Sequence, residues 1–150
     1  MQKLIPWNEH PLEGIRYFSG TAAYEHTFNL PSDRLARDKR LLLDLGRVEA
    51  LAEVSLNGKD LGVLWKPPFI LDITDTAKPG QNSLEVRVTG TWRNRLIGDA
   101  RYPDGFPGAT SPPQFKPWLG VSLNLRPDEP PAPFGLLGPV QLRTTQRFSP

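Results

Sequence analysis

The chain has 150 residues, 38% of them hydrophobic, and a formal net charge of +2. This length fits one domain with a core of ordinary size. The absence of cysteine excludes disulfides, thiolate metal sites and cysteine catalysis. There is no basic run to neutralise a phosphate backbone and no apolar run near the roughly 20 residues that span a bilayer, so neither nucleic acid nor a membrane is expected as a partner.

The first third of the chain contains one clear strand pattern. Residues 1–13 are expected to be irregular, and they hold no apolar stretch typical of a signal peptide. An exported parent protein, periplasmic or extracellular, would therefore carry its signal outside this chain. Residues 21–30 alternate between apolar and polar side chains and predict a strand. Residues 32–40 are polar and charged and predict a solvated loop.

Short apolar or alternating runs follow, separated by turn signals. These runs are residues 41–45, 52–56, 61–64, 69–73 and 84–88. Asn57 and Gly58, between two of the runs, form a strong hairpin cue. Alternation implies that one face of each strand is buried and the other wet. We therefore predict an all-β, antiparallel sandwich with little helix.

Beyond Gly90 the chain becomes rich in proline. The chain has 17 prolines and 13 glycines, and ten of the prolines fall within residues 103–139. Proline breaks a strand ladder, so this region predicts a long proline-rich loop. Residues 119–125 alternate and form a possible strand within it, and residues 140–144 predict the last strand.

The polar residues give no clear catalytic or metal-binding pattern. A glycosidase needs two carboxylates flanking the scissile bond, yet no pair here has a context that predicts a raised pKa. The aspartates considered are Asp44, Asp60, Asp72, Asp75, Asp99 and Asp104. His10 and His26 lack partners at metal-ligand spacing. We expect no catalytic residue, no metal ligand and no cofactor, with one structural calcium ion as the open alternative.

The tryptophans suggest a sugar-binding role. Aromatic faces stack on sugar rings, while amide and guanidinium groups bind hydroxyls. Trp7, Trp65, Trp92 and Trp118 are all expected in or beside turns, where ligand contacts concentrate. The candidate carbohydrate-binding residues are Trp92, Asn94, Arg95 and Trp118, with Trp65 as a lesser candidate. The competing interpretation is packing: Trp65 in the core or at an edge, and Trp92 and Trp118 under the long loop or against a neighbouring domain.

Several motifs resemble the sugar-binding-type domain of glycoside hydrolase family 2. They lie at residues 14–24, 43–48, 56–62, 65–69, 72–74 and 78–82. Residues 92–99 and 135–140 are more similar to the C-terminal domain of large bacterial α-L-rhamnosidase-like enzymes of family 106. Together the resemblance covers roughly residues 14–145, and the combination is more specific than any one motif.

The resemblance implies a galactose-binding-like jelly-roll β-sandwich, with residues 1–150 as a single domain. It also implies a non-catalytic accessory domain of a glycoside hydrolase, whose catalytic groups lie on a separate domain. The expected partners are carbohydrate or a glycosidase catalytic domain. The alternative is a purely structural interdomain or protein-interaction module without glycan affinity, which would expose an apolar patch from residues 90–139. An independent hydrolase is a third hypothesis, and we expect no such activity.

Overall fold

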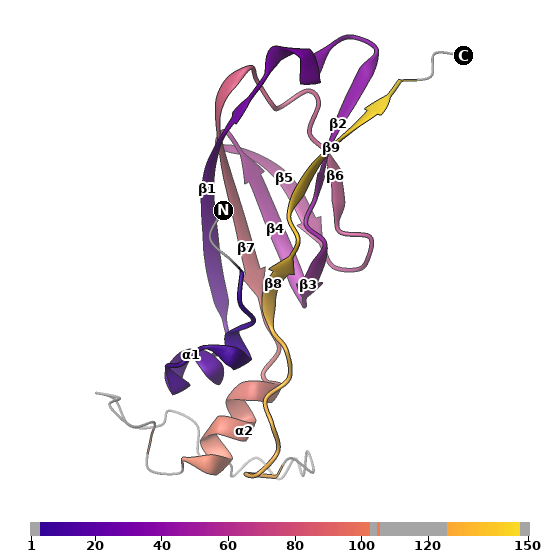
Figure 1. Cartoon of the computed structure of the whole chain (residues 1–150). Helices are drawn as coiled ribbons and strands as arrows, with labels where there is room; N and C mark the ends of the chain where they lie inside the picture. Colours follow the sequence, from indigo (N-terminus) through magenta and orange to yellow (C-terminus); the bar gives the residue numbers. More distant parts are fainter. Residues whose placement is uncertain (1–3, 103–104, 106–125, 148–150) are drawn as a thin grey trace.

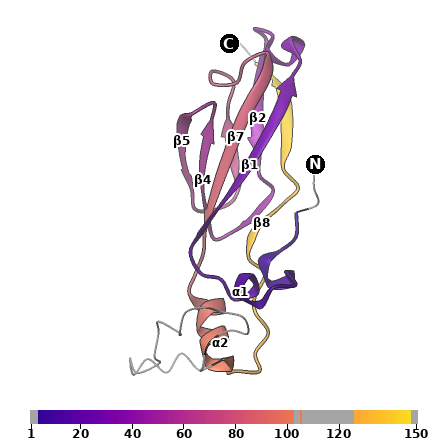
Figure 2. The same ribbon diagram turned by 90° about the vertical axis from the view of Figure 1, so that its left-hand side faces the viewer.

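The computed structural model describes residues 4–102, 105 and 126–147. One sheet has four strands in the order β1-β7-β4-β5, which lie side by side in Figure 2. A second sheet has the order β6-β2-β9, and β3 pairs with β8 alone. The strands of the first sheet are β1 (Thr21–Leu30), β4 (Leu51–Leu56), β5 (Lys59–Leu64) and β7 (Gly80–Thr89). The others are β2 (Lys39–Asp44), β3 (Arg47–Glu49), β6 (Ile70–Asp72), β8 (Gly135–Gly138) and β9 (Gln141–Gln146).

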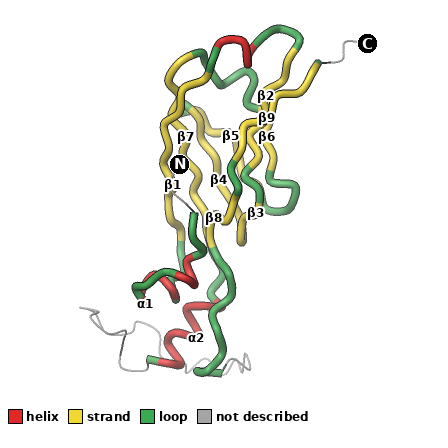
Figure 3. Tube along the Cα trace, viewed as in Figure 1, coloured by secondary structure: helices red, strands yellow, loops and turns green. Residues whose placement is uncertain are grey.

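All pairings between these strands are antiparallel. The longest joins β1 to β7 over ten residue pairs, from Thr21 opposite Thr89 to Leu30 opposite Gly80. Two short α-helices, α1 (Glu13–Arg16) and α2 (Arg93–Arg101), lie together beyond one end of the strands (Figures 1 and 3). Two 3₁₀ turns complete the fold, η1 (Trp7–Glu9) and η2 (Ser32–Leu35). The predicted all-β, antiparallel sandwich is confirmed.

The core lies between the two larger sheets. Leu84, Val86 and Val88 of β7 are buried, and the alternate residues between them face outward, as their alternation predicts. They pack in one apolar cluster with residues of β2, β4 and the β6 region. The buried members from those elements are Leu41, Leu43, Ala52, Val54, Leu56, Phe69 and Ile73.

A buried asparagine joins two turns at one end of the sandwich. Asn82 is fully buried, and its Oδ1 accepts hydrogen bonds from Asn57 Nδ2 (2.9 Å) and from the backbone N–H of Lys78 (3.0 Å). Its Nδ2 donates to the carbonyls of Lys78 (2.7 Å) and Gly80 (3.0 Å). Asn57 has a φ of +54° and Gly58 one of +79°, which suits the tight β4–β5 hairpin. The side chain of Asn82 therefore ties the hairpin to the start of β7.

Three sequence expectations need correction. Residues 32–40 are not simply a solvated loop, because η2 forms there and β2 begins at Lys39. The nine-residue helix α2 was not predicted. Residues 103–139 were expected to form a loop, yet β8 lies within them and pairs with β3. The possible strand at residues 119–125 lies outside the described residues.

The pairing of β3 with β8 could not be predicted from the sequence pattern. Both strands are short and neither alternates over enough residues to give a signal. The two segments can approach closely because Gly46 and Gly138 have no side chains: a Cβ atom at Gly46 would lie 2.4 Å from the carbonyl carbon of Gly138. No helix among the described residues has both the length and the apolar character needed to cross a bilayer.

We predict that Asn82→Ala lowers the free energy of unfolding by about 3 kcal/mol, because it leaves buried backbone groups without partners. Urea denaturation would measure this loss. The exposed Asn29→Ala is the matched control and should change stability by less than about 0.5 kcal/mol. Equal effects of the two substitutions would contradict the structural role of Asn82.

Candidate functional site

Helix α2 brings three of the predicted sugar-binding residues together. Trp92 is the N-cap residue of the helix and its side chain is 60% exposed. Asn94 and Arg95 follow in the first turn, and the Nε of Arg95 lies 2.9 Å from Asp99 Oδ1, one helical turn on. Trp118 lies outside the described residues. This end of the molecule therefore presents an aromatic ring beside a partly exposed guanidinium group.

Asn94 has a structural role in addition to its predicted contact with sugar. Its side chain is 4% exposed, and its Nδ2 donates to the carbonyl of Ala132 at 2.8 Å. Its Oδ1 accepts from the N–H of Ala132 at 2.9 Å. These paired bonds fix the segment that leads into β8 against α2. Burial leaves little of the Asn94 amide open to a sugar, and its direct contact with sugar stays a prediction.

Tyrosines lock α2 against the N-terminal helix α1. Tyr17 is fully buried, and the Arg101 Nη1 donates to its hydroxyl at 2.6 Å. The hydroxyl of Tyr102 donates to Glu13 Oε1, also at 2.6 Å. This bond to a carboxylate raises the pKa of Tyr102, which remains a neutral donor. The platform that carries Trp92 is thus held by charge-assisted hydrogen bonds on its α1 side.

Trp65 occupies a different connection, between β5 and β6. Its side chain is 70% exposed, and the ammonium nitrogen of Lys66 lies 5.0 Å from the ring centroid. The expectation that Trp65 packs in the core or at an edge is wrong, because the two prolines that follow turn the chain before the ring can be covered. Trp65 and Trp92 therefore present two separate exposed indoles.

Two of the aspartates, Asp60 and Asp72, accept hydrogen bonds from backbone N–H groups two residues further on. Asp60 Oδ1 accepts the N–H of Gly62 (2.8 Å), and Asp72 Oδ1 accepts that of Thr74 (3.0 Å). Burial tends to raise the pKa of Asp72, but the hydrogen bonds from Thr74 and the charge of Arg40 outweigh it, so this pKa lies below its ordinary value. A depressed pKa does not suit a general acid at neutral pH.

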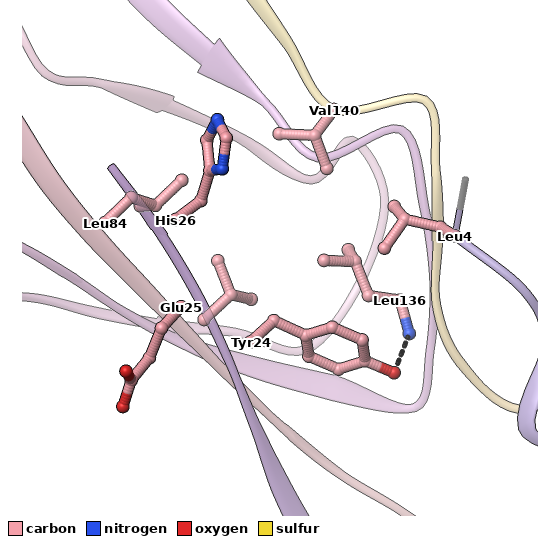
Figure 4. Close-up of a pocket in the computed structure, with 8 residues that line it drawn as sticks. Leu4, Tyr24, Glu25, His26, Leu84, Leu136 and Val140 are labelled. Carbon is pink, nitrogen blue, oxygen red and sulfur yellow. Dashed lines mark hydrogen bonds between the residues drawn. The ribbon is translucent and has the colours of Figure 1, made fainter. Parts of the chain in front are cut away.

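A groove on the open side of the sandwich was not predicted. It has a volume of about 450 Å³ and lies between β1 and the β8–β9 segment (Figure 4). Tyr24 borders it, and burial raises the pKa of this phenol although the N–H of Leu136 donates to its oxygen at 3.2 Å. The alternation of residues 21–30 marked this face of β1 as inward, but only tertiary structure shows that it is incompletely covered.

The part of the chain that the structure describes contains no obvious metal-binding site. No group of three or more His, Asp or Glu side chains there could hold a metal ion. The structural calcium considered from sequence stays a prediction. His26 borders the groove and His10 lies near the N-terminal helix, so the two histidines belong to different surroundings.

The arrangement defines a class of domain. A family model described as "Glycosyl hydrolase 2 galactose-binding domain-like" matches residues 7–117. The chain belongs to this family. A solved rhamnosidase from Novosphingobium sp. PP1Y matches 97% of this chain at 39% sequence identity, with a TM-score of 0.76. The predicted similarity to rhamnosidase-like and family 2 domains is thereby confirmed.

Two further relatives are β-glucuronidases by name. A Formosa agariphila protein named "Putative beta-glucuronidase" is 52% identical over 104 residues, 69% of this chain. A solved β-glucuronidase from an uncultured Clostridium is 34% identical over 56% of this chain, with a TM-score of 0.50. The chain spans 9% of the Formosa protein, 15% of the Clostridium enzyme and 13% of the rhamnosidase. It therefore matches a small part of proteins that are many times larger.

We predict that Asn94→Ala lowers the free energy of unfolding by about 2 kcal/mol, because both backbone groups of Ala132 lose their partner. Amide hydrogen exchange should also quicken at Ala132. Arg126→Ala, which removes an exposed side chain from the same segment, is the control and should leave both quantities nearly unchanged. Undiminished protection of Ala132 in the Asn94 variant would refute the anchoring role.

Proposed function

We propose that this chain is a non-catalytic accessory domain of a larger glycoside hydrolase of the rhamnosidase-like or family 2-like type. The observation that carries the proposal is the match to the Novosphingobium rhamnosidase, which extends over almost all of this chain but only 13% of that enzyme. A segment that makes up so small a share of an enzyme supplies support or binding more readily than a complete reaction centre. The structural roles of Asp44, Asp60 and Asp72 agree with this interpretation.

The proposal includes weak carbohydrate binding near the start of α2. Trp92 would stack on the apolar face of a sugar ring, and Arg95 would donate to hydroxyls. Asn94 would contribute chiefly by fixing the segment around Ala132 beside them, with Trp118 as a further aromatic candidate and Trp65 as a second, separate one. Support comes from the exposure of Trp65 and Trp92, since a ring of this size normally has much of its surface covered.

We expect no turnover of aryl α-L-rhamnosides or aryl β-D-glucuronides by the purified chain. The released phenol would be followed by absorbance during long incubation at high protein concentration. A full-length rhamnosidase under the same conditions serves as the positive control. Turnover that persists after repeated purification would overturn the non-catalytic assignment.

We expect millimolar affinity for a rhamnose- or galactose-containing oligosaccharide, measured by titration calorimetry. Trp92→Ala should weaken binding about tenfold, because roughly 1.4 kcal/mol of stacking energy is lost. Leu12→Ala, which truncates an exposed apolar side chain on the N-terminal segment, is the control and should bind as the parent does. No heat with any of the sugars would remove the binding part of the proposal and leave the accessory part standing.

An interdomain packing role is the second candidate, and one observation favours it. Ile5, Leu12 and Phe18 are exposed on the N-terminal segment, and Ile5 and Phe18 also line an open apolar hollow of about 630 Å³. This patch lies in residues 5–18 and not in the 90–139 region where a packing surface was expected from sequence; of that region the structure describes only part. Glycan binding with a Trp92-dependent affinity would favour the first role, and its absence would favour the second.

A further inference from the structure

The groove beside β1 is where the two sheets of the sandwich fail to cover each other. Leu84 and Val86 form its floor, and Leu136 and Val140 line the wall formed by β8 and the approach to β9. In Figure 4 the side chains of Leu4, Tyr24 and His26 also point toward this space, whereas Glu25 points away. An apolar groove of this kind, open along one side, leaves the inner face of β1 without an opposing strand.

The free edge of β9 runs along the same side. β9 ends its sheet among the described residues, with β2 as its one partner. The N–H of Arg147 donates to the backbone carbonyl of Asp38, which directly precedes β2. In an antiparallel pair with this register, the backbone N–H and C=O groups of the odd-numbered residues of β9 point toward β2. The backbone groups of Leu142, Thr144 and Gln146 therefore point outward, and the Leu142 carbonyl accepts from Arg34 Nη2 (2.9 Å) and not from a strand.

Two buried polar atoms near this edge lack partners. They are Arg34 Nε and Thr144 Oγ1, neither of which has a hydrogen bond within the described residues. A buried donor or acceptor without a partner destabilises the folded state. Thr144 belongs to β9 and Arg34 is bonded to it through the Leu142 carbonyl, so an added strand along this edge would bring backbone donors and acceptors near both residues.

The N-terminal segment already begins such a pairing at the other end of the groove. The N–H of Trp7 donates to the carbonyl of Phe134 at 3.0 Å. Leu4 Cδ1 lies 3.1 Å from the position that a Cβ atom would take at Gly138. Residues 4–7 thus run opposite to residues 134–138, and the unpaired part of the edge continues along β9.

We propose that the groove and the β9 edge together form the slot for one further β-strand. The strand is an extended peptide with apolar side chains at alternate positions, which fill the groove, and polar ones between them, which face solvent. It runs antiparallel to β9 and is supplied by another part of the larger enzyme, so the inference rests on the accessory-domain part of the proposed function. Main-chain hydrogen bonds would hold it and the groove would select its side chains.

A second copy of this chain fits the slot poorly. If two β9 edges paired symmetrically, each copy would offer the other a strand whose one large apolar side chain, Leu142, already packs against its own core, so the groove would stay unfilled. A separate extended peptide meets no such obstacle. The occupant is therefore a single strand and not another folded domain of the same kind.

The test adds an eight-residue peptide with capped termini to the ¹⁵N-labelled chain. The peptide has valine at every second position and threonine or lysine between the valines, and it is present at millimolar concentration. Amide exchange at Thr144 and Gln146 should slow about tenfold or more. Two N-methylated peptides, one methylated at the odd residues and one at the even, form the sharpest control. Only the peptide whose methyl groups face away from β9 can pair, so one of the two should retain protection and the other lose it.

Matched variants locate the site. Val140→Asp places a charge in the groove and should abolish protection, while Val63→Asp on the opposite edge strand β5 should not. Circular dichroism without peptide would verify that both variants are folded. The proposal is overturned if β9 gains no protection, if both methylated peptides behave alike, if β5 is protected instead, or if sedimentation shows that β9 is covered by dimerisation. None of these results depends on glycan binding or turnover, so failure here is distinct from failure of the proposed function.

Discussion

Burial of one face of β7 is the constraint on which the rest of the structure depends. β7 is hydrogen-bonded on both sides, to β1 along its full length and to β4 over six residue pairs. Leu84, Val86 and Val88 point from it into the core, and each such side chain contributes about 1.5–3 kcal/mol on full burial. A shift of one residue would turn these side chains outward, so the register of the four-stranded sheet follows from this strand.

Two buried asparagines fasten the ends of this framework. Asn82 joins the β4–β5 hairpin to the start of β7, and Asn94 joins the start of α2 to the segment before β8. Each side chain uses both its donor and its acceptor, so each can be buried without leaving a polar group unpaired. Between these two asparagines, the core forms from strands whose apolar and polar side chains alternate and whose apolar side chains have about the right size.

The same framework determines which surfaces the described part of the domain leaves exposed. The carboxylates of Asp44 and Asp60 accept backbone N–H groups in turns, and Asp44 also pairs with Arg143, so these groups have structural roles. What the fold leaves exposed are two tryptophans on different connections, an apolar N-terminal patch and an incompletely covered side of the sandwich. Surfaces of this kind suit contact with sugar or with the rest of a larger enzyme, which agrees with the small share of its relatives that the chain spans.

Local pattern was sufficient for the parts of the molecule in which a side chain's position depends on its near neighbours. Alternation at residues 84–88, the Asn57–Gly58 hairpin and the turn aspartates all act over a few residues, and the family motifs lie mostly among them. Other features depend on residues far apart in the chain. The hydrogen-bond partner of Asn94 lies 38 residues further along the sequence. The pairing of β8 with β3 requires two glycines that permit close contact. The exposure of Trp65 and the groove beside β1 likewise depend on which segments fail to cover them, and no local pattern records that, because burial is a property of the assembled layers.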